Sequence, residues 1–315
     1  MTQIILSALL PVVFVVALGV LAAHFGIVQK SAAPLFAAFV VGFALPLALF
    51  EGVLNVSASA IKSVPFLIAI AAGLMAIYVV ALIISQAIFH HSLSESAIQA
   101  ITCAFPSMAY SGPPVLEAVV GPEGVPVVVV GNLVTSLIMI PVTLMLVEVG
   151  QGDANAKGNT TSLAARSLAN AIKQPVVWLP IAGAALALGG VHLPRVLYLS
   201  FDLIGKSAAG VALFALGLIL YGQPLRLNRE VAFNALVKNV GQPAAFLGLA
   251  LLLGIHGTSA KELFLTGAIP TATAASALAL RYHIYSDEAA ASTLLSTAGS
   301  VVTISLAIFM AEHFA

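Results

Sequence analysis

Two apolar segments of the sequence contain prolines among small and hydroxyl-bearing residues. Residues 104–116 read AFPSMAYSGPPVL, and residues 267–276 read GAIPTATAAS. Each proline removes a backbone N–H and clashes with the preceding turn, so neither segment can form a regular helix. In a membrane-spanning segment, the freed backbone groups must be buried in protein or line a wet cavity. Because new helix N-termini carry partial positive charge and unpaired N–H groups, these breaks favour a bound anion such as a carboxylate.

The candidate binding residues are those at the two breaks, together with one amide in a neighbouring apolar segment. They are Pro106, Ser107, Ser111, Gly112, Pro114, Asn132, Pro270, Thr271, Thr273 and Ser276. The alternative is that the prolines are simple kinks and that the hydroxyls join helices. For an isolated proline that alternative would prevail, whereas a matched pair of breaks favours a binding site.

Few ionisable residues lie where they could bind an ion or move a charge within these apolar segments. The candidates are Glu117, Asp202 and Lys206. Asp202 and Lys206 are one helical turn apart, so they are expected to pair and face outward, although Lys206 would also attract an anion. Lys238 is expected to extend its amine to the membrane surface. No cofactor or metal site is expected, since there is one cysteine and the seven histidines show no ligand spacing.

Composition places the chain in a membrane. Of the 315 residues, 61% are hydrophobic and 8% are charged, against about 25% charged in soluble domains. The net charge is zero, which gives no indication of a nucleic-acid partner. The bilayer is therefore the expected solvent for most of the exterior.

Apolar runs of about 20 residues, the length that crosses a bilayer, predict ten transmembrane helices. We expect them at 4–25, 32–52, 64–89, 96–119, 124–148, 167–190, 197–222, 230–255, 261–282 and 287–311. Lys and Arg are concentrated on one side of this arrangement, which places both termini outside the cell by the positive-inside rule. We interpret the first run as a retained helix rather than a cleaved signal.

The two halves of the chain resemble each other at a fixed offset of 164 residues. PVVF at 11–14 matches PVVW at 175–178, Gly19 matches Gly183, and Pro106 matches Pro270. A unit with an odd number of spans inserts its second copy upside down, which gives an inverted repeat suited to alternating access. We expect a first five-helix repeat at 1–150, a cytoplasmic linker at 151–165 and a second repeat at 166–315.

These segments, with FALP at 43–46 and the run from Lys238 to Pro243, resemble the auxin efflux carrier family, in particular its short bacterial members of malonate-transporter type. The resemblance covers nearly the whole chain. It implies broken, crossing fourth and ninth helices, with a substrate carboxylate beside them. It also implies a scaffold of spans 1, 2, 6 and 7, a mobile unit of spans 3–5 and 8–10, a homodimer and elevator-type motion in a bacterial inner membrane. Members of that family usually have asparagine after the proline of the fourth span, where this chain has Ser107.

The resulting expectation is a secondary active transporter of small organic anions, either malonate or another weak acid. H⁺ and Na⁺ are the candidates for a coupled ion. One alternative is a sodium-coupled organic-anion symporter similar in fold to bile acid symporters. Another is a membrane sensor or scaffold that transports nothing. Enzyme chemistry is not expected, because the spans contain no paired acids and no Ser/His/Asp set.

Overall fold

The computed structural model describes residues 14–54, 64–108, 111–121, 124–151, 169, 172–191, 193–221 and 227–311. Every regular element in these ranges is a helix, and the bridge between Pro106 and Thr271 is the one strand-like pairing among them. The start of the predicted first span and nearly all of the predicted linker at 151–165 lie outside the described residues.

An apolar helix at Phe14–His24 comes first among the described residues. The helices that follow are η1 (Lys30–Ala32), α2 (Ala33–Phe39), η2 (Val40–Ala44), α3 (Leu45–Leu54), α4 (Val64–Ala87), α5 (Leu93–Ala104), α6 (Gly112–Val120), α7 (Val125–Val134), η5 (Thr135–Met139), α8 (Ile140–Gln151), α10 (Pro175–Leu188), α11 (Arg195–Gly205), α12 (Ser207–Leu220), α13 (Arg229–Leu236), η6 (Val237–Gly241), α14 (Gln242–Leu252), α15 (Gly257–Ala268), α16 (Thr273–Tyr282) and α17 (Ser286–Ala311). Of these, η2, η5 and η6 are π-helical turns within longer helices.

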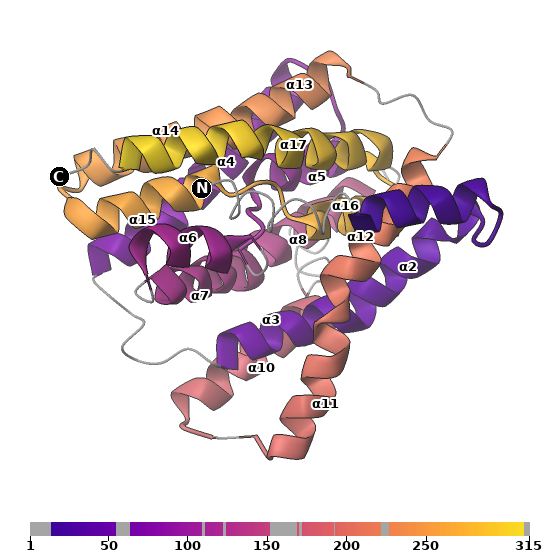
Figure 1. The fold of residues 1–315 in the computed structure, drawn as a ribbon, viewed down its shortest axis with the longest axis horizontal. Helices are drawn as coiled ribbons and strands as arrows, with labels where there is room; N and C mark the ends of the chain where they lie inside the picture. The colour runs from indigo at the N-terminus through magenta and orange to yellow at the C-terminus, as the bar shows by residue number, and fades with distance from the viewer. Residues whose placement is uncertain are drawn as a thin grey trace, which may run out of the picture.

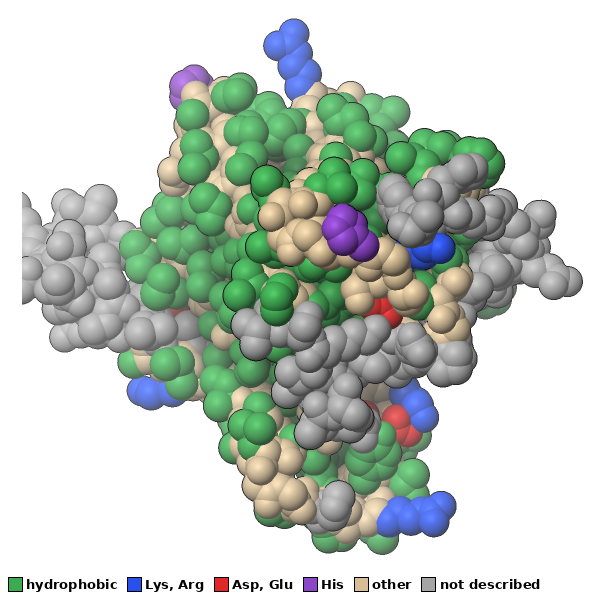
Figure 2. Space-filling view, turned by 90° about the vertical axis from the view of Figure 1, so that its left-hand side faces the viewer, with side chains coloured by type: hydrophobic (Ala, Val, Ile, Leu, Met, Phe, Trp, Pro, Cys, Tyr) green, Lys and Arg blue, Asp and Glu red, His purple; other side chains and the backbone are tan. Residues whose placement is uncertain are grey.

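Five helices among the described residues are long and apolar enough to cross a membrane. They are Lys30–Leu54, Pro65–Ala87, Val130–Gln151, Arg195–Ile219 and Arg229–Leu252. They confirm five of the predicted spans, while the total of ten stays a prediction. α17 bends by 45° between Ser286–Ser300 and Val302–Met310. The face shown in Figure 2 is mostly hydrophobic, with Lys and Arg mainly near its margins.

The helices fall into two groups (Figure 1). In one group α3 packs against α10 and α11, and α12 packs against α2. In the other, α4 packs against α5 and α14, α14 against α15, and α13 against α17. The second half of the predicted ninth span, α16, joins the two groups because it contacts α2, η2 and α12 as well as α5 and α17.

Glycines allow close helix contacts in the first group. A Cβ atom at Gly19 would collide with the carbonyl oxygen of Phe214, and one at Gly217 would collide with that of Val16. A Cβ atom at Gly183 would lie 2.9 Å from the carbonyl oxygen of Phe50. Small residues permit such backbone contact between membrane helices. We call the approach of Gly19 to Gly217 the glycine contact.

Candidate functional site

The two predicted breaks meet in the structure. α5 ends at Ala104 and α15 ends at Ala268, and the chain after each is extended. The N–H of Ser107 donates to the carbonyl of Pro270 at 2.9 Å, and the N–H of Ala272 donates to that of Phe105 at 2.8 Å. We call the paired segments, residues 105–108 and 269–272, the crossing. All eight of these residues are buried.

Partners from distant helices satisfy the carbonyls at the end of α5. In a regular helix the carbonyl of Thr102 would accept from the N–H of residue 106, which is proline and has none. The hydroxyl of Thr271 donates to this carbonyl instead, at 3.0 Å. The side-chain amide of Gln242 donates to the carbonyl of Ala104 at 2.8 Å. The break is therefore closed by the second half of the chain.

Two side chains hold the second extended segment against α17 and η6. The hydroxyl of Ser296 accepts the N–H of Thr271 at 3.1 Å and donates to the side-chain oxygen of Asn239 at 2.6 Å. The amide nitrogen of Asn239 returns a bond to the carbonyl of Ser296 at 2.9 Å. These bonds fix where the chain enters α16.

Lys238 lies next to this cluster and is fully buried, at 0% exposure. Its amine donates to the side-chain oxygen of Gln242, the residue that holds Ala104. The expectation that Lys238 extends to the surface is wrong, because this π-turn directs it at a buried acceptor. A basic group inside a membrane span is costly and marks a functional region.

The start of α6 is fixed from the first extended segment. The carbonyl of Ser107 accepts the N–H groups of Ser111 at 2.9 Å and Gly112 at 3.2 Å. Met108 packs against Gly131 of α7, where an added Cβ would lie 2.6 Å from its side chain. The neighbouring Asn132 is buried, and its carbonyl accepts the hydroxyls of Thr135 and Ser136.

Other candidate residues do not converge on the crossing. The hydroxyl of Ser276 contacts Thr293 Oγ1 at 2.6 Å and the carbonyl of Ala289 at 3.1 Å, so it joins α16 to α17. Thr273 begins α16 and is half-buried. The side chains of Pro114 and Glu117 lie outside the described part of the structure.

Two of the charged candidates, Asp202 and Lys206, lie at the end of α11, away from the crossing. Lys206, which directly follows this helix, donates to Asp202 at 2.5 Å, which confirms the expected pair, and Lys206 is exposed. The buried carboxylate of Glu51 on α3 lies close by, 3.5 Å from where a Cβ on Gly205 would stand. Glu51 is not among the candidate residues of the sequence analysis. Its position near the end of a long apolar run does, however, indicate an acid within the membrane.

Several residues that build the crossing were absent from the candidates: Thr102, Asn239, Gln242 and Ser296. The spacing of Lys238 and Gln242, four residues apart in an apolar segment, indicates a shared helix face. No comparable signal links Thr102 or Ser296 to a break elsewhere in the chain.

The chain is similar to known proteins over nearly its whole length. A family model described as "Membrane transport protein" matches residues 4–308. The chain belongs to this family, that of the auxin efflux carriers. The auxin efflux carrier family consists of membrane transporters, so this chain is an integral membrane protein and a member of a transporter family.

Two relatives extend the likeness across most of the chain. The protein of Escherichia coli strain K12 named "Uncharacterized transporter YfdV" is 27% identical over 316 residues, which cover 99% of each chain. The protein of Rhizobium meliloti strain 1021 named "Putative malonate transporter" is 23% identical over 276 residues, which cover 86% of this chain and 85% of its own.

In the present chain, α16 begins directly after the crossing, and α6 begins at Gly112, four residues beyond it. The partial positive charges at these two helix N-termini suit an anion.

Proposed function

We propose that this chain is a secondary active transporter of small organic anions, carboxylates such as malonate or another weak acid. We further propose that the anion binds at the crossing. The crossing itself carries this proposal: two proline breaks from distant parts of the chain are joined by main-chain hydrogen bonds. A helix N-terminus follows each break, and the buried Lys238 adds a basic group nearby.

The proposed architecture is ten spans arranged as two inverted repeats of five. Shifted by 164 residues, the bounds of α5 fall on those of α15. The contact of Gly19 with Phe214 has an equivalent at the same offset. Gly183 lies 164 residues after Gly19, Phe50 lies 164 residues before Phe214, and Gly183 contacts Phe50. Equivalent contacts in opposite halves are what a pseudo-two-fold relation produces.

The proposed motion is of elevator type. The scaffold would consist of spans 1, 2, 6 and 7, which form the first helix group, and the mobile unit of spans 3–5 and 8–10, which form the second. α16 supports this division because it leads from the crossing to the scaffold helices α2 and α12. Placement in a bacterial inner membrane, both termini outside and a homodimer through the scaffold complete the proposal.

Exchange of radiolabelled malonate across proteoliposome membranes tests the function. We expect rapid counterflow in the wild type and its loss in the Pro106→Ala/Pro270→Ala double variant, because regular helices would remove the N-termini at the crossing. Pro180→Ala is the matched control, since Pro180 lies buried inside α10 of the scaffold. Wild-type counterflow in the correctly folded double variant would contradict the site.

Replacing external Na⁺ by choline separates the two transport mechanisms. Counterflow that persists without Na⁺ supports the proposal, whereas strict dependence on Na⁺ would favour a sodium-coupled symporter. Stability across a panel of carboxylates completes the test, because a ligand that binds the folded state raises its melting temperature. A panel without any stabilising carboxylate, together with absent counterflow, would indicate a sensor or scaffold.

A further inference from the structure

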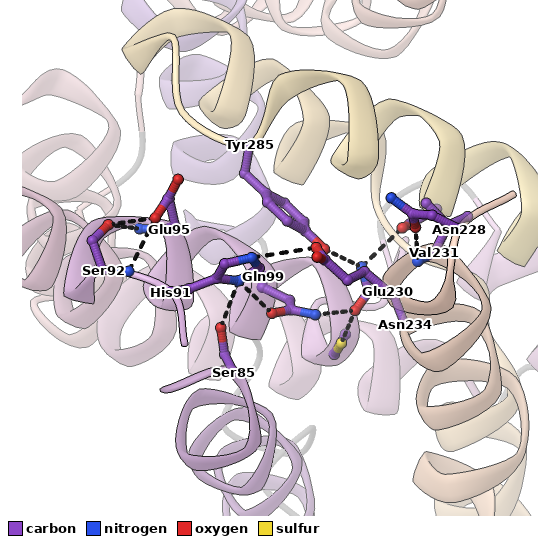
Figure 3. A network of polar contacts seen from close by, with 12 residues as sticks. Ser85, His91, Ser92, Glu95, Gln99, Asn228, Glu230, Val231, Asn234 and Tyr285 are labelled. Carbon is purple, nitrogen blue, oxygen red and sulfur yellow. Dashed lines mark hydrogen bonds and ion pairs between the residues drawn. The ribbon is translucent and has the colours of Figure 1, made fainter. Parts of the chain in front are cut away.

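A second polar cluster lies away from the crossing, at the turn between α4 and α5. Figure 3 shows His91 between Ser85, Gln99 and Glu230. Its Nδ1 lies 3.2 Å from both Ser85 Oγ and Gln99 Oε1, and its Nε2 lies 3.4 Å from Glu230 Oε2. The imidazole also stacks on Phe89, with ring centroids 6.0 Å apart. His91 thus connects the α4–α5 turn to the start of α13.

The partners of His91 determine how many protons it holds. Gln99 donates its Nε2 to Asn234 Oδ1 at 2.9 Å, so its oxygen faces His91 and can only accept. The carboxylate of Glu230 on the other side also accepts. A neutral imidazole has one N–H and can donate to one of these two partners. Both contacts are satisfied when His91 and Glu230 together hold one additional proton, with imidazolium facing carboxylate.

Two amides continue the cluster inward. Asn234 Oδ1 accepts from Gln99 and from the thiol of Cys103, while its Nδ2 donates to Ser292 at 2.9 Å and to the Tyr285 hydroxyl at 3.1 Å. If His91 loses the proton from Nδ1, rotation of both amides restores donors and acceptors along the same path. Gln99 then donates to His91, and Asn234 donates to Gln99 and accepts from the hydroxyls of Ser292 and Tyr285.

We propose that His91 and Glu230 form the binding site for a proton that is coupled to anion transport, and that Gln99 and Asn234 transmit its presence toward the crossing. This inference rests on the proposed function. Asn234 contacts Cys103, which directly precedes Ala104 at the end of α5. Asn234 also lies one helical turn before Lys238. Lys238 donates to Gln242, and the side-chain amide of Gln242 donates to the carbonyl of Ala104.

The proton can reach this site from water. A polar cavity of about 350 Å³ opens beside His91 and Glu230. The other titratable groups that line it are Glu95, His283, Tyr285, Asp287 and Glu288. Burial raises the pKa of Tyr285, which keeps its hydroxyl protonated. The hydrogen bonds from Ser92 lower the pKa of Glu95. Among these groups, the imidazole of His91 lies 3.4 Å from the carboxylate of Glu230.

Proton flux measured with a pH-sensitive dye inside proteoliposomes tests the coupling. An inward malonate gradient should move protons with malonate in the wild type. His91→Gln and Glu230→Gln keep hydrogen-bonding groups but remove the titrating pair, so the ratio of protons to malonate should fall to the leak level. His283→Gln, which changes another histidine of the same cavity, should keep the wild-type ratio. An unchanged ratio in both His91→Gln and Glu230→Gln would overturn the proposal.

Hydrogen–deuterium exchange at the imidazole carbon, followed by mass spectrometry, reports the titration of His91 in purified protein without any substrate. The Glu230→Gln variant should change the pH dependence of this exchange, because it removes the carboxylate that faces Nε2 of His91 at 3.4 Å. An unmoved titration would overturn the proton site whether or not malonate is transported. If neither malonate nor any carboxylate of the panel moves in the wild type, while Glu230→Gln still changes the exchange at His91, the proposed function and the coupling are refuted and the proton site stands.

Discussion

The crossing and the glycine contact both bring main chains from opposite halves of the sequence together, but by different means. At the glycine contact, Gly19 and Gly217 have no side chains and the backbones pack directly. At the crossing, the chains are joined by hydrogen bonds from the main chain and from Thr271, Gln242 and Ser296. The first contact depends on shape and the second on polar partners.

This difference separates a fixed contact from an exchangeable one. Close packing has no substitute partner, because any added atom overlaps the opposite backbone. A hydrogen bond can be replaced by one to water or to a ligand at little net cost, provided that no group is left unsatisfied. A scaffold suits the first kind of contact and a binding site suits the second.

The largest effect is expected at the glycine contact. Gly217→Ala places a methyl group against the carbonyl of Val16 and should destabilise the fold by about 3 kcal/mol or more, as overpacking of a tight contact does. Gly210→Ala on the same helix meets nothing within 4 Å and should leave stability nearly unchanged. Thermal unfolding in detergent measures both. Equal melting temperatures would show that the contact is not fixed.

An intermediate effect is expected at the crossing. Gln242→Leu leaves the carbonyl of Ala104 and the amine of Lys238 buried without their hydrogen-bond partner, which should cost about 2–4 kcal/mol. Gln151→Leu, at the exposed end of α8, is the matched control and should change stability little. The same thermal unfolding experiment applies. A Gln242→Leu protein as stable as the control would mean that water already replaces this amide.

The smallest effect is expected at the far end of α5. Ser92 caps this helix with Glu95 in a capping box, and Ser92→Ala should cost about 1 kcal/mol at neutral pH. The hydrogen bonds from Ser92 lower the pKa of Glu95 in the folded protein. The ionised carboxylate of Glu95 therefore contributes fully to the free energy of unfolding above the unfolded-state pKa of about 4.3. This contribution is lost as the pH falls through the lower folded-state pKa.

Melting temperatures of wild type and Ser92→Ala at pH 7 and in acid measure this dependence, and the difference between them should narrow in acid. Ser200→Ala, whose hydroxyl bonds within an exposed turn of α11, should show a difference that does not vary with pH. Suppose that Ser92→Ala lowers the melting temperature as much as Gln242→Leu does. The capped start of α5 would then matter as much to stability as its end at the crossing, which contradicts the expected order.

Long apolar elements and the places where they break could be predicted from the sequence. Hydropathy alone locates α4, and the prolines at 106 and 270 are sufficient to interrupt their helices. The pairing of Asp202 with Lys206 also follows from their spacing. These features depend on neighbours in the chain, which a sequence shows directly.

The partners at the crossing could not be predicted in the same way. Thr271 reaching Thr102, or Ser296 reaching Thr271, depends on how helices rotate against each other. Ser276 shows the same limit, since its hydroxyl faces α17 rather than the crossing. Lys238 was expected at the surface, because hydropathy does not show that a π-turn directs it inward.

The bonds of the crossing also constrain how the protein is made. The carbonyl of Phe105 and the N–H of Ser107 find their partners at Ala272 and Pro270, which are translated more than 150 residues later. At about 5–20 residues per second, the first half waits on the order of ten seconds or more for these groups. A polar backbone break cannot face lipid for that time. The nascent first half therefore needs water or an insertion factor to shield it until the second half arrives.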